Sequence, residues 1–294
     1  MDELHHFTSG MKSVFSQQAM DGLLVARQSV GGAGYTAWSG LPFLVEDFSP
    51  TVTFEGDNTV MAQQSCKYLI KLFKQVNKGK KVGGLFTYLN ELPSFKGLKS
   101  RAELAEEFTQ PAQIDEALKV CSLSLIDTTL RKFLASGASE VEKTNYLFAL
   151  DIVGMAQHHI KYLVFVIMRQ KVEGSAIDPN LKTHLMNLCS LMGLVYLKEN
   201  LISGYNCGYF RDGASALIDS ALELLLKRIR PQAINLAELF GLKDEVLVSA
   251  IGNSYGDIYE THFEWAKTSR LNTPNGNIAK GWMENMMPIL KGKL

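Results

Sequence analysis

The sequence lacks a net charge, because thirty basic residues balance thirty acidic ones over 294 positions. A chain with no excess of either sign has no general electrostatic attraction for nucleic acid or for an acidic membrane. Its 46% hydrophobic and 20% charged residues are typical of a globular protein. We therefore expect neither nucleic acid nor a charged lipid surface as a general partner.

Metal-ligand spacing is missing among the four cysteines, which form no Cys-x-x-Cys pair and lie in apolar, helical contexts. We interpret them as reduced core residues of an intracellular protein, and we expect no disulfide between them. They are Cys66, Cys121, Cys189 and Cys207.

The histidines are equally poor in metal-site patterns. Adjacent residues on a helix point about 100° apart, so the pair His158 and His159 makes a poor metal site. We expect one of the two to be packed and the other exposed. His184 and His262 have no acidic or cysteine partner at ligand spacing, so we expect no metal there either.

Long apolar runs are absent, and the longest, residues 162–168, is far too short to span a bilayer. Asp2 and Glu3 occupy the place where a signal peptide carries basic residues. The chain ends in Gly292-Lys293-Leu294, which resembles the peroxisomal address Ser-Lys-Leu with glycine in the first position. We expect no membrane span and treat this ending as a weak signal.

No segment alternates with a period of two, and no repeat or low-complexity tract is present, so strands are not expected. Apolar residues recur instead at helical spacing, which predicts an all-α fold of helical bundles joined by short loops. The expected helices are residues 1–30, 58–76, 113–134, 143–172, 181–198, 214–228, 231–241, 244–251 and 255–267.

Glycine and proline mark the connections between these helices. Residues 38–50 are expected to run as an irregular connection, residues 82–110 as a partly helical crossover, and residues 203–213 as a bend. The basic, glycine-containing loop at 77–81 changes the composition from apolar to charged. We place a domain boundary there, between residues 1–78 and residues 79–294.

A single carboxylate, Glu55, stands at a loop-to-helix junction, after Phe54 and before Gly56. If water is excluded there, the charged form of the carboxylate is destabilised and the group becomes a base able to take a proton from carbon. Gly56 would leave room for a docked substrate. The alternative is that Asp57 or Asn58 caps the next helix and Glu55 is an exposed loop acid.

A glycine-rich turn at Gly31, Gly32 and Gly34 ends the first helix. By itself it indicates only a helix C-cap and a loop. It lacks the strand before and the helix after that a dinucleotide-binding fingerprint requires.

Several blocks of the sequence resemble, in order and spacing, the C-terminal half of an acyl-CoA oxidase, a flavoenzyme related to the acyl-CoA dehydrogenases. The resemblance covers nearly the whole chain. The blocks are RQSVGGAGY, SGLP, TFEGDNTV, YLNELPS, RPQAINLAELFGLKDEVLVSAIG and YETHFEWAKTSRLN.

The resemblance implies a reaction in fatty-acid β-oxidation. The glutamate of the family's TxEG motif, here Glu55, would remove the α-proton of an acyl-CoA while hydride passes from the β-carbon to FAD. Oxygen would then take the electrons, so the products are trans-2-enoyl-CoA and hydrogen peroxide. The helical segment after residue 79, which short dehydrogenases lack, favours the oxidase over the dehydrogenase.

The resemblance also implies positions for the cofactor. Gln28, Gly31 and Gly32 match the turn that meets the FAD of a partner subunit, and Asp57 and Thr59 stand where the dehydrogenases contact flavin. Arg27 has two equally good interpretations. It could neutralise a phosphate of the cofactor, or it could be a cation at the end of a helix.

The family's N-terminal helices and flavin-binding β-barrel have no counterpart in these 294 residues. Residues 1–78 would be the end of the first C-terminal helical domain, and residues 79–294 the second. The chain would be a fragment or one half of a split enzyme, and the alternative is a non-catalytic helical dimerisation or scaffold subunit. We expect a homodimer or a partner chain that supplies the flavin-binding half. The expected location is the peroxisome, with the mitochondrion as the alternative.

Overall fold

The computed structural model describes residues 1–270, 272 and 280–292. All regular secondary structure in these residues is helical, which confirms the all-α prediction. The chain forms two compact units. Unit 1 comprises Met1–Gln18 and Thr51–Leu239, and unit 2 comprises Ala19–Pro50 and Phe240–Leu294.

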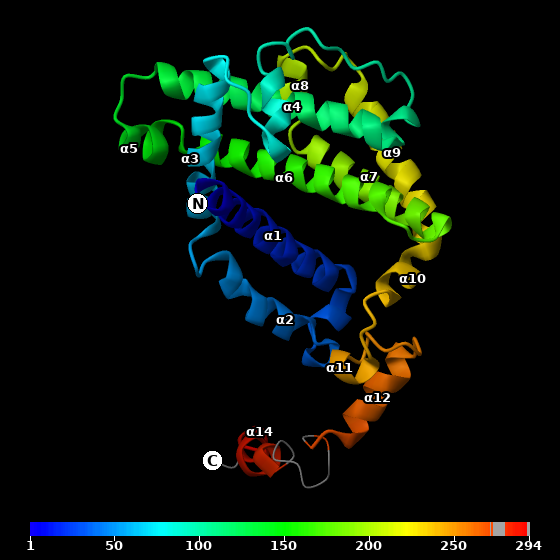
Figure 1. The fold of residues 1–294 in the computed structure, drawn as a ribbon. Helices are drawn as coiled ribbons and strands as arrows, with labels where there is room; N and C mark the ends of the chain where they lie inside the picture. Colours follow the sequence, from blue (N-terminus) through cyan, green and yellow to red (C-terminus); the bar gives the residue numbers. More distant parts are fainter. Residues whose placement is uncertain (271, 273–279, 293–294) are drawn as a thin grey trace. The chain divides into compact units, whose positions relative to one another are not determined.

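The long helices follow the predicted periodicity closely, with ends that differ by a few residues (Figure 1). They are α1 (Asp2–Ser29), α3 (Asn58–Asn77), α4 (Pro111–Ala135), α6 (Ala149–Gly174), α7 (Pro179–Lys198) and α9 (Ala214–Ile229). Proline opens α4 and α7, where its missing N–H costs nothing. The Asp178 carboxylate caps α7 by accepting from the N–H groups of Asn180 and Leu181.

Shorter helical segments join and follow the long helices. The α-helices among them are α2 (Leu41–Phe48), α5 (Glu140–Glu142), α8 (Leu201–Asn206), α10 (Ala233–Glu238), α11 (Asp244–Leu247), α12 (Ile258–Thr268) and α14 (Met287–Leu290). The 3-10 and π segments are η1 (Gly31–Gly34), η2 (Ala37–Ser39), η3 (Ser49–Val52), η4 (Gly84–Glu91), η5 (Glu107–Thr109), η6 (Lys143–Leu147), η7 (Arg230–Gln232) and η8 (Trp282–Met286).

The prediction of an irregular connection over residues 38–50 is wrong, because α2 occupies most of it. Gly40 adopts a left-handed conformation just before the helix, and Pro42 sits in its first turn, a position that proline tolerates. The bend expected at residues 203–213 likewise begins inside a helix, α8. In both cases glycine and proline mark the edge of a short helix.

Unit 1 is built around α6, which packs against α3, α4 and α7, while α9 packs against α7. The core is apolar, and burying each leucine or phenylalanine contributes roughly 1.5–3 kcal/mol. Fully buried members include Leu69, Phe73, Leu118, Ile126, Leu163, Phe165, Leu194 and Leu225.

A chain of hydrogen bonds between two buried histidines crosses this core. His6 Nδ1 donates to the Ser65 carbonyl oxygen at 2.8 Å, so the Nε2 atom of a neutral His6 must accept. His159 Nε2, 3.1 Å away, therefore donates to it, and His159 Nδ1 accepts from the Tyr88 hydroxyl. Burial lowers the pKa of His6 and lowers that of His159 much further. Both rings are neutral, and together they connect α1, α3, α6 and η4.

The expectation that one of His158 and His159 is exposed is wrong, because both are buried. α6 is covered on several sides by α3, α4 and α7, so two adjacent side chains can both point inward. Burial lowers the pKa of His158 to about 3. The cysteines are free as predicted, and Cys207 alone among them is half-buried while the others are buried.

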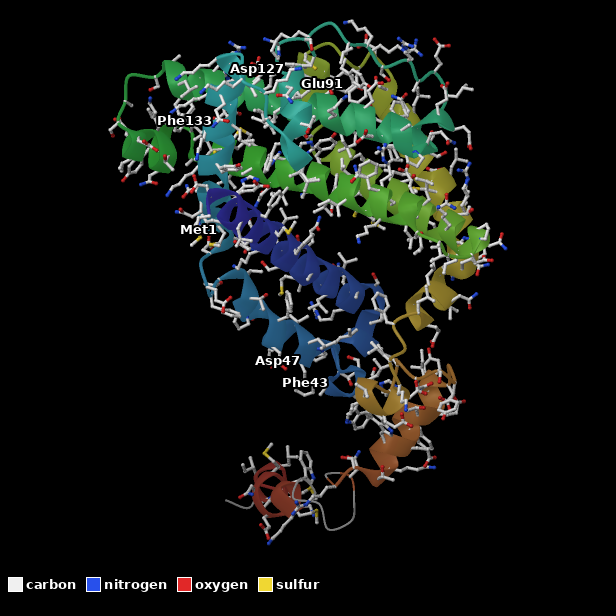
Figure 2. All side chains as sticks on the ribbon, in the orientation of Figure 1. Met1, Phe43, Asp47, Glu91, Asp127 and Phe133 are labelled. Atoms are coloured by element: carbon white, nitrogen blue, oxygen red, sulfur yellow. The ribbon has the colours of Figure 1, made fainter. Side chains whose placement is uncertain are left out.

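Charged side chains in unit 1 pair across its helices. Asp127 on α4, labelled in Figure 2, is buried and accepts from Arg131 at 2.5 Å and from Lys96 at 2.8 Å. Glu91, also labelled there, pairs with Lys119 at 2.8 Å. No helix in the described residues is long and apolar enough to cross a membrane.

Unit 2 joins two segments that lie more than 200 residues apart. The Ala250 N–H donates to the Trp38 carbonyl oxygen at 2.8 Å, and Ser249 Oγ donates to the Ser39 carbonyl oxygen at 2.5 Å. The Trp38 ring also lies edge-on to Trp265 of α12, with ring centroids 6.5 Å apart. These contacts bring together the segments just before α2 and just after α11.

Candidate active site around Glu55

Glu55 lies at the strained end of the turn between η3 and α3. Its φ of 58° is in the left-handed region, which costs a non-glycine residue about 1–2 kcal/mol. Gly56 follows with a φ of 100°, and a Cβ there would lie 2.6 Å from Met61 Sδ. Such strain persists only where the surroundings impose it, and it gathers at functional sites.

Helix α1 imposes this conformation. Lys12 Nζ donates to the Gly56 carbonyl oxygen at 2.6 Å and to Asn58 Oδ1 at 2.8 Å. Ser16 Oγ donates to the same Asn58 Oδ1 at 2.9 Å, and Ser13 Oγ donates to the Asn58 carbonyl oxygen at 2.7 Å. The backbone on the C-terminal side of Glu55 is thus held by three side chains of one helix face.

The sequence prediction missed Lys12 as a residue of this site, and it considered Asn58 only as a helix cap. Asn58 is buried, and its amide also donates to Gln17 Oε1 at 3.2 Å. The arrangement extends to α6, where Gln157 Nε2 donates to Ser13 Oγ at 3.2 Å. In the sequence, the position of Asn58 directly after the helix-capping Asp57 was the one local sign that Asn58 belongs to this site.

Asp57 caps α3, as the simpler of the two interpretations predicted. Its carboxylate accepts from the Thr59 N–H at 2.8 Å, and this hydrogen bond lowers the pKa of Asp57. The Asp57 side chain is therefore engaged by the helix end, and Thr59 is exposed. Contact of either residue with a flavin stays a prediction.

The Glu55 side chain is exposed, so this chain does not provide the water-excluding surroundings that the sequence analysis expected. The left-handed turn places residue 55 on the outside of the loop. The neighbouring Phe54 and Val60 are also exposed, at 51% and 45%. Exposed apolar side chains thus lie close to Glu55 along the chain, on both sides of it.

The glycine turn lies in unit 2, directly after α1. Gly31 has a φ of 60°, and a Cβ on Gly34 would lie 2.1 Å from the Arg27 carbonyl oxygen, so the fold itself requires both glycines. A Cβ on Gly32 would meet nothing within 4 Å. Gln28 is exposed and Arg27 is half-buried.

This geometry fits the close approach of a phosphate-bearing cofactor. The backbone of Gly31 and Gly32 is exposed, and nothing lies within 4 Å of either position where a side chain would begin. A group could approach the backbone closely at Gly32, because no side chain covers it there.

Comparison with known proteins identifies the family. The sequence profile of the family described as "Acyl-CoA oxidase" matches residues 110–291, and that of "Acyl-CoA oxidase, C-alpha1 domain" matches residues 1–70. The chain belongs to the acyl-CoA oxidase family. The boundary expected between residues 78 and 79 falls between the two matches and stays a prediction.

Relatives of this acyl-CoA oxidase chain include peroxisomal acyl-coenzyme A oxidase 1 of Phascolarctos cinereus, 32% identical over 98% of this chain and 44% of the relative. The solved structure of Arabidopsis thaliana acyl-CoA oxidase 1 has a TM-score of 0.92 and 27% identity, over 100% of this chain and 44% of its own. Acyl-CoA oxidase-2 of Caenorhabditis elegans, solved with FAD, ascaroside-CoA and ATP, has a TM-score of 0.86 and 25% identity, over 99% and 42%. The chain therefore spans less than half the length of these relatives.

Proposed function

We propose that this chain is the C-terminal helical part of an FAD-dependent acyl-CoA oxidase that converts acyl-CoA and O2 to trans-2-enoyl-CoA and hydrogen peroxide. The observation that carries the proposal is the strained Glu55–Gly56 turn, which Lys12 holds in place through the Gly56 carbonyl oxygen. A residue whose backbone has an unfavourable conformation, next to a backbone segment held by a network of side chains, is typical of a position used for chemistry.

Glu55 is the proposed base. Its carboxylate takes the proton from the α-carbon of the thioester, and the same residue holds that proton once the double bond forms. When bound, FAD accepts the hydride from the β-carbon and passes two electrons to O2, which becomes hydrogen peroxide with two protons. The task of this chain is to hold the carboxylate at the α-carbon, and Gly56, beside it, leaves space for the substrate.

Phe54 and Val60 support a role for a second polypeptide. Phe54 directly precedes Glu55 and Val60 lies in the first turn of α3; both side chains are exposed, and burying them would be favourable. A flavin-binding half packed over them would remove water from Glu55 and strengthen it as a base. We propose that this half comes from another chain or from a preceding segment, and that the complete enzyme is a homodimer.

Gln28, Gly31 and Gly32 are the proposed FAD contacts in unit 2, and Asp57 and Thr59 those in unit 1. Gly32 fits such a contact, because nothing lies within 4 Å of the position where a side chain would begin. Asp57 would make such a contact in addition to its cap of α3.

One observation favours a second function, a non-catalytic helical scaffold derived from the enzyme. Glu55 is exposed in this chain, and an exposed carboxylate is a weak base for a carbon acid. A subunit retained for dimerisation alone would keep the helical packing of unit 1 and have no need for a covered carboxylate.

Reconstitution separates the two functions. The chain would be co-expressed with the N-terminal part of Arabidopsis thaliana acyl-CoA oxidase 1 that it does not match. The enzyme proposal predicts a yellow complex that releases hydrogen peroxide with palmitoyl-CoA, while each half alone is inactive. A stable complex that contains flavin and yet shows no turnover would support the scaffold.

The proposed location is the peroxisome, which rests on relatives named as peroxisomal acyl-CoA oxidases. Lys293 and Leu294, the last two residues of the sequence that resembles a peroxisomal address, lie outside the described residues. A fluorescent protein fused before the chain, with and without Lys293 and Leu294, would test whether the ending is read as an address.

A further inference from the structure

A groove of about 420 Å³ runs along the exposed face of α3, beyond the Glu55 turn. Its lining is dominated by one kind of side chain, since five of its eight residues are lysines. They are Lys67, Lys71, Lys74, Lys78 and Lys80. The first four recur every three or four residues and so form one stripe on the helix.

Most of these ammonium groups have no acidic partner. Lys71 pairs with Asp2 at 2.7 Å, and Lys67 donates to the neutral Gln64 at 2.7 Å. Within the part of the chain that the structure describes, no carboxylate lies within 4 Å of the ammonium groups of Lys67, Lys74, Lys78 or Lys80. Glu140 is the acid in the lining. The groove is thus strongly positive in a chain whose net charge is zero.

Helix electrostatics explains only part of this stripe. Lys74 and Lys78 lie at the C-terminal end of α3, where cations are favoured by the helix dipole. Lys67 and Lys71 lie in the middle of the helix and gain nothing from the dipole. Like charges three or four residues apart destabilise a helix, and a bound polyanion would remove that repulsion.

The shape and lining favour a small molecule over a protein or a membrane. The volume lies within the range of small-ligand pockets. Protein interfaces are depleted in lysine and have an apolar centre, whereas Ile70 is the one apolar residue of this lining. Lysine is a compact point charge that binds phosphate well. We propose that this groove binds a soluble small molecule that carries several phosphate groups, at a site separate from the Glu55 turn.

Sodium tripolyphosphate is the probe for this site, titrated calorimetrically into the purified chain at low salt. We expect saturable binding with a stoichiometry near one. The double variant Lys74→Glu/Lys78→Glu should weaken it at least tenfold, and Lys74→Gln/Lys78→Gln should fall between that variant and the unchanged chain. Raising the salt concentration should also weaken it, because exposed charges are screened.

The matched control is Lys227→Glu/Lys243→Glu, which changes the net charge by the same amount at two exposed lysines outside the groove. It should bind within twofold of the unchanged chain, and thermal melts should show that every variant is folded. Equal loss in the control would overturn the proposal, because binding would then follow net charge alone. No binding of tripolyphosphate, with lysine-dependent binding to phosphatidylserine vesicles, would also overturn it in favour of a membrane surface. None of these readouts depends on flavin or on turnover, so failure here leaves the oxidase proposal standing.

Discussion

The ammonium nitrogen of Lys12 lies 2.6 Å from the carbonyl oxygen of Gly56, 44 residues further along the chain. This contact fixes the peptide between Gly56 and Asp57, one residue beyond Glu55, and the same nitrogen also donates to Asn58 Oδ1. The position of the proposed base is therefore set by a helix that ends in the proposed FAD turn. A change at Lys12 should alter Glu55 without touching it.

Replacing Lys12 by methionine should release the turn. A hydrogen bond to a charged group contributes about 1.5–3 kcal/mol, so we expect Lys12→Met to lower the free energy of unfolding by about that amount. In the reconstituted enzyme the variant should lose turnover while flavin content stays the same. Lys267→Met, which breaks an exposed pair with Glu264, should cost no more than about 1 kcal/mol. Urea unfolding of both variants measures the difference.

Gly32→Ala tests the proposed FAD turn by separating stability from cofactor binding. A methyl group at position 32 meets nothing within 4 Å, so the chain alone should be as stable as before. In the reconstituted complex the methyl group should obstruct the cofactor and lower the flavin content. Gly22→Ala, equally free of contacts but in the interior of α1, should raise the stability by about 0.5–1 kcal/mol and leave the flavin content unchanged. Normal flavin content in Gly32→Ala would remove position 32 from the FAD contacts.

Acid should destabilise unit 1 through its buried histidines. The folded-state pKa of each of His6, His158 and His159 lies below the ordinary value, so the unfolded chain binds more protons as the pH falls below about 6.5. Stability is then fully present above that pH and falls as the pH drops toward the folded-state pKa values. Each histidine contributes a slope of about 1.4 kcal/mol per pH unit once the unfolded form is fully protonated.

Denaturant unfolding between neutral pH and about pH 5 measures this slope. His158→Gln removes one buried titrating group and leaves the His6–His159 contact in place. The dependence of its unfolding free energy on pH should therefore be smaller by the contribution of one histidine. Stability that is independent of pH below 6.5 would contradict the assignment of neutral, buried rings.

Helical spacing was enough to predict where the long helices lie, because each buries one apolar face. It was not enough for α2, where Gly40 and Pro42 suggest a break and instead open a short helix. The burial of both His158 and His159 was also missed, since a prediction from one helix cannot count how many neighbours surround it. The long helices α3, α4 and α7 pack against α6, and α1 contacts it through His6 and Ser13.

The candidate site also contains some residues that the sequence could indicate and others that it could not. Glu55 and the glycine turn could be singled out from local sequence and from the resemblance of whole blocks to a family. Lys12 could not, because nothing in the sequence indicates that a lysine in one helix binds a carbonyl oxygen 44 residues later. The exposure of Glu55 matches the simpler of the two interpretations, because covering its side chain depends on surfaces that the described residues do not supply.

The most direct test of Glu55 as the base is anaerobic reduction of the bound flavin by palmitoyl-CoA in the reconstituted complex. With Glu55→Gln, the flavin should be bound as before, and its reduction should be slower by a factor of about 100 or more, since a positioned base contributes typically 10²–10⁴-fold. Reduction of the flavin by the Glu55→Gln complex at the rate of the unchanged complex would contradict the account.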